Sequence, residues 1–133
     1  MNAHDEELVQ AAKAVRARSY SPYSGFAVGA ALRGKSGRIY TGTNVENASY
    51  PLTVCAERAA VFKAVSEGER EFDSIAVVTS TGAAPCGACR QVLAEFGLDI
   101  RVVVANLNKR RKVYSISELL PHGFDVSQLA RES

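Results

Sequence analysis

The three cysteines of this chain and one nearby glutamate form its clearest chemical pattern. Cys55 and Glu57 stand in C-x-E, and Cys86 and Cys89 follow further along in P-C-x-x-C. Zinc prefers thiolate or imidazole ligands in tetrahedral geometry, and a catalytic zinc site keeps one of its four positions open for water. Three cysteines without a close histidine therefore predict a catalytic site with one Zn²⁺ per chain. Water bound to such a zinc has a pKa of about 7, so hydroxide becomes available at neutral pH.

Each half of this pattern lies where a helix is expected to begin. Residues Ala56–Ser66 are good helix formers with an apolar face, and Pro85 suits the start of a second helix that continues through Gln91–Phe96. Cys86 and Cys89 are three residues apart, so they share one face of a first helical turn. The partial positive charge of a helix N-terminus favours thiolates. Two helix starts aimed at one point would therefore build an anionic metal pocket.

Glu57 and Arg58 are expected to serve the metal site without binding the metal. Glu57 would diverge from Cys55 in the middle of a helix, so Cys55 must lie at the helix entrance, with Glu57 above the open zinc position as a proton carrier. Three thiolates leave excess negative charge around a divalent ion. A guanidinium at Arg58 that donates to the thiolates would offset this charge. The alternative for Arg58 is an ordinary exposed helix arginine.

Each feature has a simpler interpretation when it is taken alone. A single cysteine is more often a small buried hydrophobe, and a lone C-x-x-C is equally typical of a redox pair or half of a structural zinc knuckle. A carboxylate such as Glu57 is favoured in any first helical turn by the helix dipole. Their combination is much less expected by chance, and it matches the zinc-deaminase signature of one ligand, a nearby glutamate and P-C-x-x-C.

At these residues, and over most of its length, the chain resembles the cytidine deaminase family. The matching segments are Tyr20–Ala31, Gly42–Tyr50, Cys55–Arg58, Pro85–Val92 and Glu118–Phe124. The chain is similar to the short, homotetrameric branch that uses three cysteine ligands. The resemblance implies an α/β fold, a cytidine-deaminase-like three-layer α/β/α sandwich with a central mixed sheet of about five strands. It also implies a single domain over residues 1–133 and active sites near subunit interfaces.

The activity that this resemblance implies is hydrolytic deamination of cytidine and 2′-deoxycytidine, in pyrimidine salvage. The products would be uridine or 2′-deoxyuridine and ammonia, with zinc-bound hydroxide attacking C4 of the base and Glu57 shuttling protons. One alternative is a related zinc aminohydrolase for another aminated heterocycle, such as a blasticidin-type antibiotic. Another is a non-catalytic zinc-binding module, which would need a fourth protein ligand. For that role the sequence offers only the distant His4 and His122.

Asn44 and Glu46 form an N-x-E pair near the end of an expected strand. Residues two apart on an extended chain point to the same face, and the pattern alone fits a solvated strand end. The resemblance implies instead that the pair binds the ribose of a nucleoside, which argues against the antibiotic substrate. By the same resemblance, the other substrate-binding residues are Phe26 beside the nucleoside, Ala56 near the base, and Ala48, Tyr50 and Phe124 from a neighbouring subunit. Phe26 could otherwise be an ordinary core residue.

The composition fits one globular domain and excludes several function classes. A chain of 133 residues with 47% apolar residues can bury a core, and a net charge of +2 is too balanced for nucleic acid or a membrane surface. The basic cluster Lys109–Lys112 is typical of a solvated loop. An odd number of cysteines excludes a complete disulfide framework, so reduced thiols indicate a cytoplasmic protein. Neither a signal peptide nor a membrane span is expected.

Helical and extended patterns alternate along the chain and predict an α/β layered domain. The first helix is expected over His4–Tyr20, where apolar residues recur every three or four positions. Strands are expected over Phe26–Leu32, Arg38–Val45, Ser74–Thr79 and Ile100–Ala105, with a short edge strand over Lys112–Ser115. An S-x-x-E capping pattern at Ser115 predicts the start of a short last helix.

Overall fold

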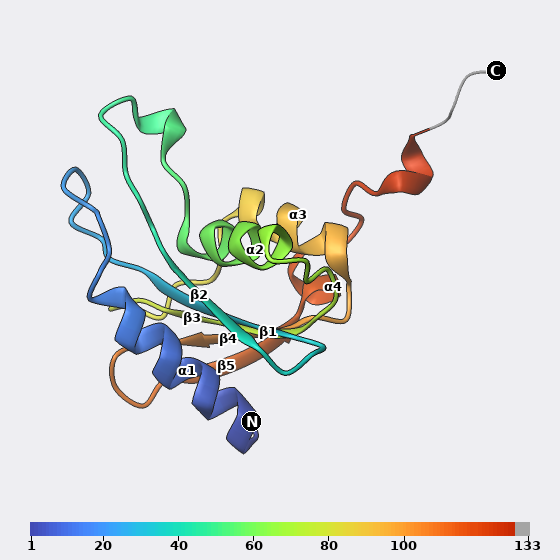
Figure 1. Cartoon of the computed structure of the whole chain (residues 1–133), viewed down its shortest axis with the longest axis horizontal. Helices are drawn as coiled ribbons and strands as arrows, with labels where there is room; N and C mark the ends of the chain where they lie inside the picture. The colour runs from blue at the N-terminus through green and yellow to red at the C-terminus, as the bar shows by residue number, and fades with distance from the viewer. Residues whose placement is uncertain (130–133) are drawn as a thin grey trace.

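A five-stranded sheet lies between helices on both of its faces in the computed structural model, which describes residues 1–129 (Figure 1). The strands are β1 (Gly29–Gly34), β2 (Ile39–Thr43), β3 (Phe72–Val78), β4 (Arg101–Ala105) and β5 (Arg111–Ser115). Their order across the sheet is β2-β1-β3-β4-β5. Strands β3 and β4 are parallel, and every other neighbouring pair is antiparallel. The predicted mixed sheet of a three-layer sandwich is thus confirmed.

Helix α1 covers one face of this sheet, while α2, α3 and α4 lie on the other (Figure 1). Their bounds are Ala3–Arg16 for α1, Ala56–Ser66 for α2, Gly87–Phe96 for α3 and Ile116–Leu119 for α4. Two short 3₁₀ helices, η1 and η2, span Tyr50–Leu52 and Val126–Gln128. Among residues 1–129 no helix has both the length and the apolar character needed to cross a membrane.

The two faces of the sheet build two separate apolar cores, because neighbouring side chains of a strand point in opposite directions. In β4, Val102 and Val104 pack in the core under α2 and α3, while Val103 and Ala105 pack in the core under α1. The central strands β3 and β4 are covered on both faces. This is why they are continuous apolar runs, without the alternation of a half-exposed strand.

Two predicted boundaries are wrong near the N-terminal end of the chain. Helix α1 ends at Arg16, before the predicted end at Tyr20, because the backbone of Tyr20 pairs with a distant segment: its N–H donates to the carbonyl of Asn44 at 3.1 Å. Strand β1 begins at Gly29, three residues after Phe26. The Asn44 side chain instead bonds the backbone just before β1, with its amide nitrogen 2.8 Å from the Phe26 carbonyl. Both differences follow from tertiary hydrogen bonds that no local pattern encodes.

Helix α2 packs so closely on β2 that the strand needs a glycine at Gly42. A Cβ atom at this position would lie 2.6 Å from the backbone nitrogen of Ala60 and 2.7 Å from the carbonyl oxygen of Ala56. Both contacts are with helix backbone, which cannot move aside without shifting α2 as a whole. Gly42 therefore sets the distance between the helix and the sheet.

Gly42→Ala is expected to lower the free energy of unfolding by about 1–3 kcal/mol, the usual cost of overpacking a close contact. Urea denaturation followed by circular dichroism would measure the loss. Gly87→Ala is the matched control, because an added Cβ there meets no atom within 4 Å. Equal unfolding midpoints for Gly42→Ala and the unsubstituted protein would contradict this account of the packing.

Candidate metal centre and active site

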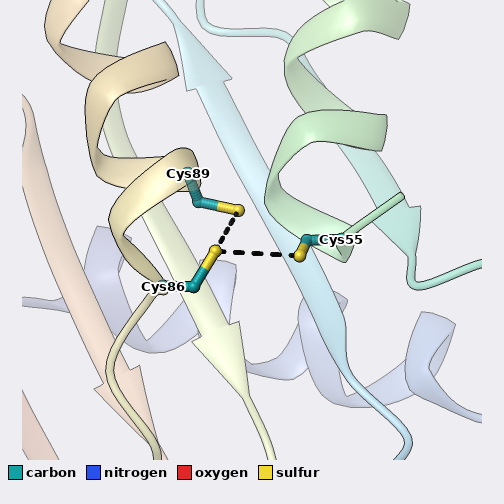
Figure 2. Close-up of side chains that lie close together, drawn as sticks. All are labelled: Cys55, Cys86 and Cys89. Carbon is teal, nitrogen blue, oxygen red and sulfur yellow. Dashed lines mark hydrogen bonds between the residues drawn. The ribbon is translucent and has the colours of Figure 1, made fainter. Parts of the chain in front are cut away.

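Helices α2 and α3 begin next to each other, and a cysteine precedes the first residue of each. Cys55 is the N-cap residue of α2 and Cys86 that of α3, both with extended backbone conformations, and Cys89 lies in the first turn of α3. Neither N-cap thiol bonds the backbone of its own helix. Figure 2 shows the three sulfur atoms turned toward one another across the gap between the helix starts. The expected position of Cys55 at the helix entrance is confirmed.

The spacing of the three sulfur atoms fits a single zinc ion. The Sγ atoms of Cys55 and Cys86 are 3.9 Å apart, and those of Cys86 and Cys89 are 3.5 Å apart. All three lie within 4.8 Å of one another. Zinc–sulfur bonds of about 2.3 Å in tetrahedral geometry place sulfur atoms about 3.8 Å apart. The side chains thus need little movement to hold the metal, and among residues 1–129 no fourth histidine, cysteine or carboxylate joins their group.

Glu57 is buried beside this cysteine group, with 5% of its surface exposed. Burial raises the pKa of its carboxyl group to about 7, and the nearby charge of Cys55 acts in the same direction. A carboxyl group with this pKa exchanges protons readily in both directions at neutral pH. Glu57 also lines the cavity that adjoins the cysteines, so it combines the access and the proton affinity of a general acid and base.

The guanidinium of Arg58 lies against the sulfur of Cys55, with its Nη2 atom 3.3 Å from Sγ. Hydrogen bonds from Cys89 and Arg58 outweigh burial and lower the pKa of the Cys55 thiol to about 5. The hydrogen bond with Cys55, together with burial, raises the pKa of Cys89. Arg58 thus favours a thiolate at Cys55, which is the form that binds zinc.

Arg58→Ala is expected to reduce turnover more strongly than it reduces the stability of the fold. Removing a group that hydrogen-bonds a metal ligand typically costs about 10- to 100-fold in activity or metal affinity. Steady-state kinetics and urea denaturation would measure the two effects side by side. Lys63→Ala is a suitable control, because Lys63 is exposed on the same helix. Equal losses of turnover and stability on the Arg58→Ala change would contradict a role in tuning the thiolates.

A cavity of about 240 Å³ opens beside the cysteine group. This volume is slightly below the range of about 300–1,000 Å³ that is usual for drug-sized ligands, and it suits a smaller molecule. The predicted site residues that line it are Phe26, Asn44, Glu46, Tyr50, Cys55, Glu57 and Cys86. Residues far apart in the sequence thus share one cavity with two of the three cysteines.

Asn44 is buried, and its side chain holds the segment that leads into β1. Its Oδ1 atom accepts hydrogen bonds from the Ser19 hydroxyl and from the Val28 N–H, the latter at 3.0 Å. Its Nδ2 atom donates to the Phe26 carbonyl at 2.8 Å. One N–H of the amide has no bond among the described residues, so Asn44 can both shape the cavity wall and donate to a ligand.

Glu46 is buried as well, and its carboxylate closes the turn that precedes Phe26. Its Oε1 atom accepts from the N–H groups of Tyr23 at 2.9 Å and Ser24 at 3.1 Å, while the Ser24 hydroxyl donates to Oε2. These hydrogen bonds, that of the Ser24 hydroxyl first, lower the pKa of Glu46. The carboxylate is therefore ionised at neutral pH and keeps acceptor capacity on Oε2.

Three predicted substrate-binding residues do not line the cavity within one chain. The Ala56 side chain is fully buried in the core under α2, and Ala48 is exposed. Phe124 is 54% exposed and lines a separate hollow formed with the end of α3 and the loop after α4. The roles of Ala48 and Phe124 toward a neighbouring subunit, and that of the Ala56 backbone, stay predictions.

Seven further residues also line the cavity, and the sequence alone had not indicated them as site residues. They are Ser24, Val28, Thr53, Val77, Thr79, Ala83 and Ala84. Ser24 and Val28 fall in the matching segment Tyr20–Ala31, which could have indicated them. Thr79, Ala83 and Ala84 belong to no motif, and only the folded chain brings them to the site.

Comparison with known proteins gives consistent matches over nearly the whole chain. Residues 2–106 match the family model described as the cytidine and deoxycytidylate deaminase zinc-binding region. The chain is 46% identical over 128 residues to the cytidine deaminase of Sporosarcina psychrophila, covering 94% of each protein. It is 49% identical over 125 residues to that of Halalkalibacterium halodurans, covering 92% of this chain and 95% of the relative.

Solved structures agree with this result. The crystal structure of cytidine deaminase from Burkholderia pseudomallei superposes with a TM-score of 0.88 at 49% identity, covering 93% of this chain and 100% of that one. The cytidine deaminase of Mycobacterium tuberculosis superposes with a TM-score of 0.80 at 40% identity, covering 92% and 98%. The likeness thus extends to the arrangement of the whole sandwich.

Proposed function

This chain belongs to the cytidine deaminase family, and we propose that it hydrolyses cytidine and 2′-deoxycytidine to their uridine forms and ammonia. The enzyme is a zinc-dependent hydrolase. The observation that carries the assignment of its chemistry is the triangle of cysteine sulfurs at two helix starts, beside a cavity lined by the buried Glu57.

In this proposal Cys55, Cys86 and Cys89 hold the metal, and Glu57 moves the protons. When bound there, zinc would lower the pKa of a water molecule to about 7, so that hydroxide is available near neutral pH. Glu57 would take one proton from the attacking water and deliver it to N3 of the base. It would then take the proton of the new C4 hydroxyl and pass it to the departing amine. Cytidine and water are thereby converted to uridine and ammonia, with Glu57 returned to its starting state. Its pKa of about 7 supports both directions of transfer.

The sugar is held, we propose, by Asn44 and Glu46. The free N–H of the Asn44 amide can donate to a ribose hydroxyl, and Oε2 of the ionised Glu46 can accept from one. Phe26 is 38% exposed where it lines the cavity, so its ring can pack against the nucleoside. These contacts would select a nucleoside over the free base.

Ammonia release from zinc-loaded protein tests this function, with cytidine, cytosine and blasticidin S as parallel substrates. Rapid release from cytidine, with much slower release from cytosine, is the expected result. Preferential release from blasticidin S would favour an aminohydrolase for another heterocycle. No release from any of them, by protein that holds one zinc per chain, would favour a non-catalytic module. The absence of a fourth ligand near the sulfurs, among residues 1–129, speaks against that module.

We also propose a homotetramer of single-domain chains, located in the cytoplasm and acting in pyrimidine salvage on a free nucleoside. Exposed apolar side chains, with 50% or more of their surface accessible, support burial against further subunits: they include Tyr50, Leu52, Phe62 and Phe124. Thiols that must stay reduced to bind zinc suit the cytoplasm. Light scattering of the purified protein would measure the assembly, and a monomeric mass would contradict it.

A further inference from the structure

We propose that Thr79 is a positioning residue, whose hydroxyl fixes the turn over residues 80–84 and thereby one wall of the substrate cavity. The inference rests on the proposed function, since it names a residue that shapes the site for the nucleoside. No cysteine, carboxylate or matching segment pointed to this residue. The folded chain alone brings it to the cavity.

The backbone of Thr79 is held by the central strands of the sheet. It directly follows β3, and its N–H donates to the Ala105 carbonyl at the end of β4 at 3.2 Å. Only 2% of its surface is exposed, although it lines the cavity. The hydroxyl is thus anchored by the parallel pair at the centre of the sheet, and it can hold less regular backbone in place.

The hydroxyl oxygen of Thr79 accepts two backbone hydrogen bonds from the turn. The N–H groups of Gly82 and Ala83 both donate to Oγ1, each at 2.9 Å. No helix or strand includes residues 79–86, so these amides have no regular secondary structure to satisfy them. The Thr79 side chain therefore satisfies the two backbone N–H groups of this turn, which neighbouring backbone carbonyls would satisfy in a strand.

The conformation of Gly82 shows how closely the turn is specified. Its φ angle is +75°, in the left-handed region that favours glycine. A Cβ there would meet its nearest atoms, on Asn106 and Arg110, at 3.6 Å, so space is not what requires glycine. The backbone bends back at this residue, and the bend aims two successive N–H groups at Thr79.

The turn matters for the site because its last two residues line the cavity and a cysteine of the metal centre follows shortly after it. Ala83 and Ala84 line the cavity, and Pro85 and Cys86 follow directly. Without the two hydrogen bonds, the amides of Gly82 and Ala83 would need water as a partner, and the turn would move away from the strand end. Ala83 and Ala84, which form this wall of the cavity, would then no longer lie at a fixed distance from a bound nucleoside.

Thr79→Val is the sharpest test, because valine has nearly the shape of threonine and no acceptor. We expect the KM for cytidine to rise about tenfold, with kcat within about threefold, because two hydrogen bonds that set the wall are lost. Zinc should remain at one equivalent per chain. Thr79→Ser retains the oxygen and should restore the KM. Thr81→Val makes the same chemical change on an exposed residue of this turn and should leave the KM unchanged.

An unchanged KM in Thr79→Val would overturn the proposal, whatever happens to the unfolding midpoint, because a purely structural residue would affect stability alone. Amide hydrogen exchange of the unsubstituted protein gives a test without catalysis. The Gly82 and Ala83 amides should exchange at least tenfold more slowly than an unstructured peptide, since they are hydrogen-bonded. Exchange at the unstructured rate would also overturn it. If the protein releases no ammonia from cytidine but these amides are protected, the proposed function fails and the fixed turn stands.

Discussion

Glu57→Gln is expected to abolish turnover of cytidine while one zinc per chain remains bound. Glutamine has the shape of glutamate and fits the same buried position, of which 5% is exposed, but it cannot take up and release a proton. General acid–base catalysis contributes about 10²- to 10⁴-fold for a single transfer. Because Glu57 is proposed to serve more than one transfer, we expect a loss at or above the upper end of that range. Ammonia release and zinc analysis on one preparation would measure both quantities.

Glu95→Gln is the matched control for this change. Glu95 is exposed on α3, and its neutralisation alters the net charge of the protein by the same amount. We expect the control to retain normal turnover. Activity of Glu57→Gln within tenfold of the unsubstituted enzyme would refute the proton-carrier role. Loss of zinc along with activity would instead assign Glu57 to the integrity of the metal centre.

Cys89→Ala is expected to remove zinc from the protein and, with it, all activity. Cys89 is fully buried, and its sulfur lies 3.5 Å from that of Cys86. With this thiolate gone, two cysteines remain, and neither His4 nor His122 belongs to the group that could replace it. Atomic absorption after dialysis would give the zinc content per chain.

Cys89→Ser separates metal binding from packing, because serine is close in size to cysteine but is a poor zinc ligand. Both variants should lose zinc if Cys89 is a ligand. Circular dichroism would establish whether each variant retains the helical and strand content of the fold. A full zinc equivalent in folded Cys89→Ala would exclude Cys89 from the ligand set.

The elements of this fold that local patterns describe were predictable from the sequence. The central strands are apolar runs, and α2 was expected over the residues that form it, Ala56–Ser66. The short helix α4 begins directly after its N-cap residue Ser115, whose side chain and that of Glu118 form the expected capping box. Where an end depends on a distant partner, the prediction failed. The backbone bond from Tyr20 to Asn44 sets the end of α1. The bonds between the Asn44 side chain and the backbone of Phe26 and Val28 set the start of β1.

In the candidate site, too, the residues with a local sequence signal were predictable and the others were not. The cysteines and Glu57 were accessible because their spacing and the two helix starts are local signals. Thr79 carries no such signal, since a threonine at a strand end is common everywhere. Ser24 lies in an ordinary turn, and only the matching segment Tyr20–Ala31 could have indicated it. Their roles depend on what folding places opposite them. Ser24 meets the carboxylate of Glu46, and Thr79 meets the backbone amides of Gly82 and Ala83.

Helix α2 separates the metal centre from a surface turn at its other end, where a probe could be attached. The helix starts directly after Cys55 and ends near the β1–β2 hairpin turn, where Glu67 pairs with Arg38 at 2.8 Å. Its 11 residues span about 16 Å at about 1.5 Å per residue. Ser36, exposed in that turn, is therefore a natural attachment point for a dye or an affinity handle. A probe there would report on the unfolding of the sandwich while the nucleoside cavity stays unobstructed.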